Sequence, residues 1–314
     1  AFLMSEFTRV PYIEIVLVSI FPAMLYFGSV YLLVHIAAVK LGLKGIAQAD
    51  LPLVRDVLAK GWHFLLPLVV LVYFLVAGYS PLRVGFFAVV SVAAAAVGRA
   101  LWDFLRDGPT LTKARDLGAR GLALTLQALE LGARNAVAVS MACAVAGIIV
   151  GVVGLTGLGL KFSAMMLAFS GGNMLLALLL VIIASLILGM GLPVTAAYIV
   201  LIILVGPALT NEFGVPLLIA HLVVFWYSQD SNVTPPVALA GFAGSAIAGS
   251  KPMETSFQAW KYAKGLYLIP LFLVFNEVII IGGPVPLVIW NGALAIVGLV
   301  AFAAMLEGFL FAPM

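Results

Sequence analysis

The sequence predicts an all-α polytopic membrane protein, and three observations support this prediction. Hydrophobic residues make up 64% of the chain and charged residues only 9%, whereas charged residues are about a quarter of a typical soluble domain. The mean hydropathy is +1.23, and the chain contains apolar runs long enough to cross a hydrocarbon layer of ~30 Å. Two of these runs are interrupted in the middle by glycine, proline or polar residues. These two interruptions are the candidate functional features.

The first part of the chain, residues 1–39, contains a span predicted from about Ile15 to Val39. Residues 40–101 follow as a polar linker and a two-helix membrane hairpin that turns at Ser80-Pro81. The chain opens on an alanine without an initiator methionine, and we interpret it as a piece of a longer protein.

The next part, residues 102–134, is amphipathic rather than apolar. Its polar and charged side chains recur three, four or seven positions apart between 112 and 134, so they share one face of a helix rich in leucine elsewhere. This pattern predicts an arm-like helix that lies flat at the membrane surface.

The last part, residues 135–314, contains both interruptions. Run 174–209 is broken by Gly-Met-Gly-Leu-Pro, and each arm of about 15 residues is too short for a ~30 Å layer, which predicts a re-entrant hairpin. Run 215–248 holds Asp230 and two adjacent prolines, which remove backbone donors and predict a broken helix. Further spans are expected at 136–153, 266–281 and 285–305.

The distribution of positive charge favours the re-entrant hairpin. If run 174–209 enters and leaves the membrane on the same side, most of the 16 lysines and arginines fall on one side of the membrane. Only Arg9, Arg83 and Lys161 fall on the other side. The positive-inside rule makes the rich side cytoplasmic, so the hairpin enters from outside. Counting the run as a single crossing moves the basic segment 251–264 outside and weakens the asymmetry.

Two interruptions of this kind are typical of a secondary transporter. In such proteins broken segments meet near the midplane, where helix N-termini face anionic groups and freed carbonyls coordinate a cation. Neutral side-chain oxygens near the breaks suit a hard cation, and Asp230 could add a charge or take up a proton. The neutral oxygens belong to Ser185, Thr195, Ser231, Asn232 and Thr234.

Other classes of protein fit the residues less well. The net charge of +3 comes without a basic cluster, which argues against a nucleic-acid partner. His35, His63 and His221 are too widely separated to suggest a zinc site, and no Ser/His or Cys/His arrangement indicates an enzyme. An ion channel and a non-transporting membrane scaffold stay as alternatives, as do close helix packing at the glycines and a simple kink at the prolines.

Three stretches resemble the large membrane subunit of TRAP transporters, most closely the fused permeases of the TAXI subgroup. They are Leu188–Tyr198, Val233–Ala238 and Ile247–Met253, and residues 1–12 are similar to the end of the family's first broken helix. The resemblance implies an elevator-type transporter fold with inverted repeats, of which only the second is complete here. It also implies import of a carboxylate-like organic anion, delivered by an extracytoplasmic binding protein, across a bacterial or archaeal inner membrane.

By this resemblance the hairpin tip and the unwound loop enclose the coupling ion, which is sodium held by backbone carbonyls or a proton taken up by Asp230. No cofactor is expected beyond this ion. The N-terminal remainder of the permease and small-subunit-like helices are the other expected partners. The cation-binding residues would be Gly189, Met190, Gly191, Pro193, Ser231, Asn232, Val233 and Thr234, and the substrate-binding residues Thr195, Asn232, Thr234 and Pro235.

Overall fold

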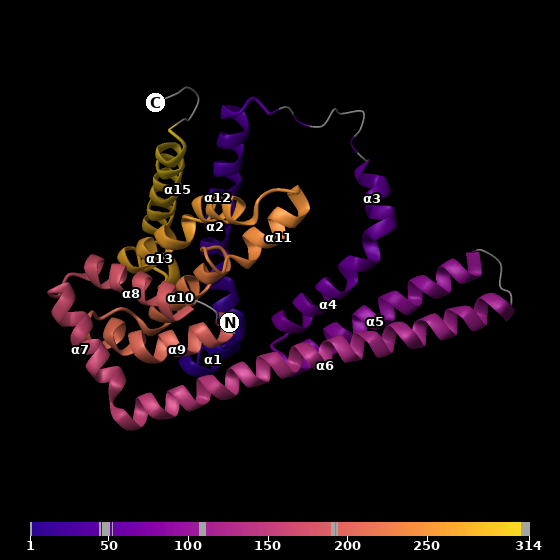
Figure 1. Ribbon diagram of the computed structural model, residues 1–314, viewed down its shortest axis with the longest axis horizontal. Coiled ribbons are helices and arrows are strands. Elements are labelled where there is room, and N and C mark those ends of the chain that lie inside the picture. Colours follow the sequence, from indigo (N-terminus) through magenta and orange to yellow (C-terminus); the bar gives the residue numbers. More distant parts are fainter. Residues whose placement is uncertain are drawn as a thin grey trace. The chain divides into compact units, whose positions relative to one another are not determined.

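A computed structural model describes residues 2–43, 45, 51, 53–106, 111–189, 192 and 194–308 (Figure 1). The structure is 85% helical, and the described residues contain no strand. Four helices within the described part of the chain are long and apolar enough to cross a membrane: Tyr12–Lys40, Leu82–Arg106, Val194–Glu212 and Val285–Glu307. The prediction of an all-α polytopic membrane protein is confirmed.

The chain divides into two compact units, and each is described by itself. One consists mainly of residues 3–43 and 138–314, and the other of residues 44–137. The first unit carries both interruptions and therefore every predicted site residue.

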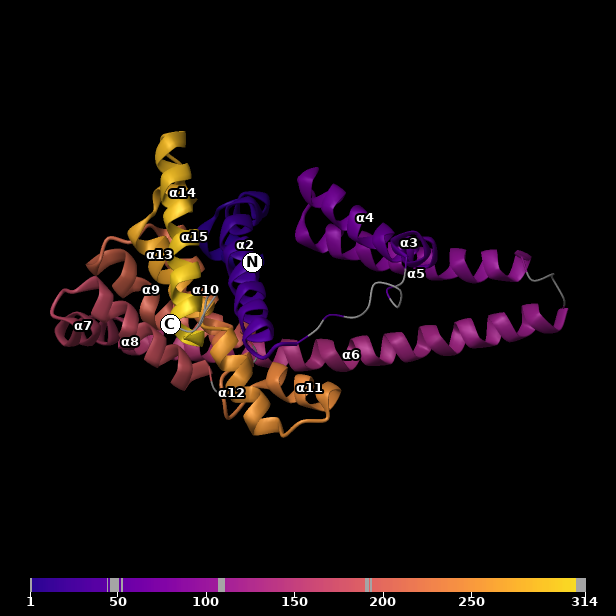
Figure 2. The same cartoon turned by 90° about the horizontal axis from the view of Figure 1, so that it is seen from above.

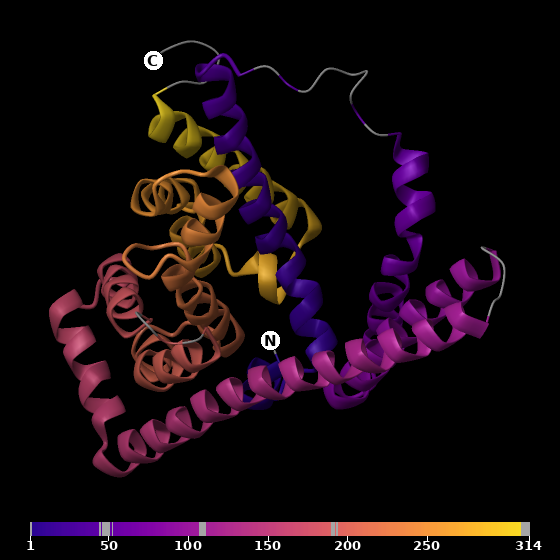
Figure 3. The same cartoon turned by 45° about the vertical axis from the view of Figure 1, so that its right-hand side comes forward.

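Two long apolar helices pack side by side in the first unit (Figures 1 and 3). They are α2, Tyr12–Lys40, which follows the short α1, Phe2–Thr8, and α15, Val285–Glu307. The Glu307 carboxylate is only 4% exposed at the end of α15, where it forms ion pairs with Lys261 Nζ at 2.6 Å and Lys40 Nζ at 3.6 Å. The ends of both helices are therefore joined to the helix that carries Lys261.

The core of the first unit is built by α9, Val194–Pro207, and α10, Leu217–Ser228, which pack against each other. Both helices are apolar on all sides, and a helix with this pattern is stable only when it is surrounded. Leu201 and Val205 on α9 and Ile219 on α10 are fully buried. The two interruptions lie next to this core because one precedes α9 and the other follows α10.

Run 174–209 forms two helices that pack together, as the sequence predicts. The first is α8, Met174–Gly189, which α7, Leu158–Ser170, precedes. The second, α9, continues into a π-helix, η3, at Ala208–Glu212, and this combined arm of 19 residues is long enough to cross a membrane. The prediction that each arm is too short to cross the membrane therefore holds for α8 but is wrong for the second arm. The re-entrant path itself stays a prediction.

Run 215–248 contains the predicted break. After α10 the chain forms a 3₁₀ turn, η4, at Asp230–Asn232, and helical structure resumes at α11, Leu239–Ala248. The peptide between Pro235 and Pro236 is cis. Helix α11 then packs against α12, Pro252–Tyr262 (Figure 2).

The span expected at 266–281 is interrupted, and the prediction of one continuous span is wrong. Helix α13, Gly265–Phe275, ends at Asn276, and the short α14, Val278–Ile281, follows. Asn276 leaves the helical conformation, and its Nδ2 donates to the Phe272 carbonyl at 3.1 Å. An asparagine side chain that bonds the local backbone competes with helix continuation.

The second unit contains the predicted two-helix hairpin, in which α4 and α5 pack together. The Phe74 and Phe87 rings stack across the pair with their centroids 4.4 Å apart. The helices of this unit are α3, Val54–Gly61; η2, Trp62–Phe64; α4, Leu65–Val76; α5, Pro81–Arg106; and the first part of α6, Leu111–Thr156.

Helix α6 joins two elements that the sequence predicts as separate. The expected surface helix 112–134 and the expected span 136–153 form one continuous helix of 46 residues. No proline separates the two segments, and the first strong helix-ending signal is Gly157, with φ of +63°. Beyond it the direction changes by 73° into α7. The placement of residues 112–134 at the membrane surface stays a prediction.

Candidate functional site

The candidate site centres on Asp230, whose side chain is fully buried at the end of α10. The backbone closes tightly around it, because the amides of Val233 and Thr234 both donate to the Asp230 carbonyl, at 3.1 and 3.0 Å. The polar loop is therefore an ordered turn. A buried carboxylate is costly unless hydrogen bonds or a cation compensate it.

The two oxygens of the Asp230 carboxylate have different surroundings. Oδ1 accepts hydrogen bonds from Thr234 Oγ1, at 2.7 Å, and from the Tyr267 hydroxyl. Trp260 Nε1 in turn donates to the Tyr267 oxygen at 2.9 Å. Oδ2 is buried and has no hydrogen-bond partner among the residues that the structure describes. Residues of α12 and α13 thus fix one carboxylate oxygen and leave the other unsatisfied.

Lys264 is the positive charge beside this cluster. Its Nζ lies 3.2 Å from the centre of the Trp260 ring and 5.0 Å from that of Tyr267. It is near enough to act electrostatically on Asp230, yet among the described residues it forms no ion pair within 4 Å. The ammonium is held by aromatic faces, an arrangement stabilised by the ring quadrupole.

The structure brings the first hairpin arm to the break, because α8 contacts η4. Gly189 is buried at the end of α8, and its carbonyl accepts from the Leu192 amide at 3.3 Å. Thr195 is half-buried in the first turn of α9. The remaining tip residues of the prediction, Met190, Gly191 and Pro193, lie outside the described residues.

The predicted loop residues form the turn and the return to helix. Ser231 belongs to η4 through its backbone, and the Asn232 amide donates to the Gln229 carbonyl at 3.1 Å. Asn232, Val233 and Pro235 are partly exposed. Their predicted contacts with cation or substrate stay predictions, whereas Thr234 and Asp230 are shown to bond each other.

A second buried polar contact joins α9 and α10 and was not found from the sequence. Tyr198 on α9 and His221 on α10 are both buried, and the Tyr198 hydroxyl lies 2.7 Å from His221 Nδ1. His221 looks isolated in the sequence because its partner is 23 residues away on another helix. The bond ties the second hairpin arm to the first half of the broken helix.

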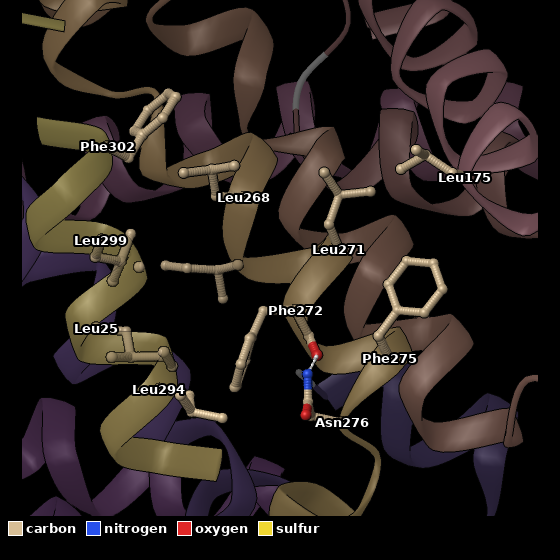
Figure 4. A pocket seen from close by; sticks show the side chains of 13 residues that line it. Leu25, Leu175, Leu268, Leu271, Phe272, Phe275, Asn276, Leu294, Leu299 and Phe302 are labelled. Atoms are coloured by element: carbon tan, nitrogen blue, oxygen red, sulfur yellow. Dashed lines mark hydrogen bonds between the residues drawn. The ribbon is translucent and has the colours of Figure 1, made fainter. Parts of the chain in front are cut away.

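Two of the pockets in the described part of the first unit are lined by other residues. One of about 430 Å³ is almost entirely apolar, and side chains of α13 and α15 face each other across it (Figure 4). A smaller pocket of about 270 Å³ is lined by His221 together with Thr210, Asn211 and apolar residues. None of the predicted site residues lines either pocket.

Most of the chain is similar to a known protein family. The family model for the DctM component of tripartite ATP-independent periplasmic transporters matches residues 1–283, which include both interruptions. No curated protein and no solved structure matches the chain. Members of this family are transporter subunits that generally work with a substrate-binding protein and a small membrane subunit. The chain belongs to the DctM family of TRAP transporter large components and is a multi-pass membrane protein.

Proposed function

We propose that the chain is the permease part of a secondary active transporter that imports a carboxylate-like organic anion with sodium. The observation that carries the proposal is the contact of α8 with η4, where a break in one helix meets the end of another around the buried Asp230. Broken helices free carbonyls and amides that can bind an ion and an anionic group at membrane depth. The family match supports transport rather than another use of this geometry.

In this proposal the coupling ion binds between the hairpin tip and the unwound loop. Backbone carbonyls of the tip, 189–193, and of the loop, 231–234, hold sodium, and Thr195, Asn232, Thr234 and Pro235 contact the substrate. The neutral oxygens and the few available charges suit a hard monovalent cation. A proton taken up by Asp230 is the alternative coupling ion.

The wider assembly follows from the resemblance to the TAXI subgroup. An extracytoplasmic binding protein delivers the substrate, and the N-terminal remainder of the permease and small-subunit-like helices complete the transporter. The protein lies in a bacterial or archaeal inner membrane with its basic loops in the cytoplasm. Residues 1–39, 40–101 and 102–134 precede the second repeat, 135–314, which moves as an elevator.

The test is uptake into proteoliposomes that contain the full-length permease and its binding protein. A panel of ¹⁴C-labelled short-chain mono- and dicarboxylates serves as substrate, with a sodium gradient and a proton gradient imposed separately. We expect accumulation of at least one labelled acid with the inward sodium gradient, and none when all gradients are collapsed.

Asp230→Asn separates the two coupling ions in the same assay. If sodium is the coupling ion, any uptake that remains in Asp230→Asn should have the same pH dependence as wild-type uptake. A flattened pH profile, together with wild-type accumulation driven by the proton gradient alone, would assign the coupling to Asp230 protonation and contradict sodium.

A further inference from the structure

We propose that Oδ2 of Asp230 is a ligand of the coupling sodium ion, and that the ammonium group of Lys264 competes with sodium for this oxygen. The inference rests on the proposed function, because it assigns a carboxylate ligand and a competing cation to the same transport site. Sodium binding by backbone carbonyls alone, as in the proposed function, requires neither a carboxylate ligand nor a competing cation.

The two oxygens of the Asp230 carboxylate are unevenly bonded. Oδ1 already accepts from Thr234 and Tyr267, whereas the buried Oδ2 has no partner within the described part of the chain. Placing an ionised carboxylate in a low-dielectric interior is costly unless a cation or donors compensate it. Oδ2 is therefore the atom of the turn at which a small cation gains the most.

Lys264 is the cation that the described part of the structure places beside Asp230. Lys264 immediately precedes α13, one turn before Tyr267, and its ammonium group lies on the Trp260 face. A lysine ammonium has three donors on a flexible stem, so rotation can exchange an aromatic face for a carboxylate oxygen. Because the ammonium group forms no ion pair within 4 Å with any described residue, those donors can turn to a carboxylate oxygen.

The consequence is that sodium and Lys264 exclude each other at Oδ2. With sodium bound, the ammonium stays on Trp260; without sodium, it neutralises Asp230. The buried carboxylate is then paired in both conditions, which avoids the cost of an unpaired charge during the return of the unloaded carrier. Lys264 acts here as a positioning residue with no contact to the substrate.

The experiment measures the stabilisation of the purified, detergent-solubilised full chain by NaCl, with choline chloride at equal ionic strength as the reference. The midpoint of the rise in melting temperature reports sodium affinity. In mildly alkaline buffer, Lys264→Gln should lower the sodium midpoint roughly two- to tenfold, because a competing and repelling charge is gone. Lys264→Arg should preserve most of the wild-type midpoint, and Asp230→Asn should abolish the sodium response.

A matched control separates competition from a general loss of charge. Lys251→Gln removes the same charge from an exposed lysine that pairs with Glu254 at 2.8 Å, and it should leave the sodium midpoint unchanged. An unchanged midpoint in Lys264→Gln, or an equal shift in Lys251→Gln, overturns the competition. A full sodium response in Asp230→Asn overturns the ligand role while sodium-driven uptake still stands. A wild-type protein with neither sodium stabilisation nor sodium-driven uptake overturns the proposed function and this inference together.

Discussion

Thr234 offers the most direct test of the site at the scale of a single residue, because its hydroxyl group bonds the buried carboxylate of Asp230. Thr234→Ala removes this donor together with one methyl group. A hydrogen bond to a charged group contributes about 1.5–3 kcal/mol, so we expect the initial uptake rate to fall roughly tenfold or more. Asn232→Ala should also abolish uptake if its amide contacts the cation or the substrate. Uptake and membrane insertion are measured for both variants.

Two further variants make the Thr234 result specific. Thr234→Ser keeps the hydroxyl group and should restore most of the uptake rate. Ser245→Ala removes a buried hydroxyl that donates to the Phe242 carbonyl of its own helix at 2.7 Å, and should transport normally. Wild-type kinetics in Thr234→Ala and Asn232→Ala together would remove both residues from the site.

At the same scale, the sequence could identify only half of the cluster. Asp230 and Thr234 were predicted because they lie in a polar loop within an apolar run. The sequence could not predict Tyr267 and Trp260, because their contact with that loop depends on how α12 and α13 pack against it. Trp260 looks like an interfacial anchor in sequence, yet its indole bonds the Tyr267 hydroxyl.

At the scale of elements, the pairing of α11 and α12 depends on one glycine. A Cβ added to Gly241 would lie 2.6 Å from the Ser256 Cα atom, which is backbone and cannot move aside cheaply. Gly241→Ala should therefore cost about 1–3 kcal/mol of stability through overpacking. We expect a lower melting temperature for the detergent-solubilised protein.

The control for this prediction lies three residues further along the same helix. A Cβ on Gly244 would meet only the Thr255 methyl group at 3.8 Å, an ordinary contact. Gly244→Ala should be neutral or slightly stabilising, since alanine favours a helix over glycine by about 0.5–1 kcal/mol. Equal melting temperatures for the two variants would contradict the close approach of α11 and α12.

Most elements follow from the sequence because hydrophobic run length and proline placement act locally. The long apolar α15 and the break after α10 were predicted on this basis. Two element boundaries differ from the prediction for local reasons that are weaker signals in the sequence. An asparagine ends α13, and no strong helix-ending signal lies inside α6. The π-helical extension of α9 depends on packing against its neighbours, which the linear pattern does not encode.

At the scale of the whole molecule, transporter and channel make opposite predictions for exchange. A carrier that alternates between two states couples outward to inward movement of the substrate, whereas an open pore does not. Proteoliposomes loaded with unlabelled acid should therefore show accelerated entry of the same labelled acid at equilibrium. Entry that is unaffected by the internal acid, and that continues with all gradients collapsed, would favour the channel.

The buried Glu307 also constrains the order in which the protein is made. Lys40 donates to the Glu307 carbonyl at 2.6 Å across 267 residues of chain, and both Lys40 and Lys261 pair with its carboxylate. During synthesis α2 emerges long before α15, so its lysine cannot pair with Glu307 until translation has reached residue 307. The ion pairs at the ends of these helices therefore form only after the other described helices have been made. Completion of α15 is thus a late step in the assembly of the first unit.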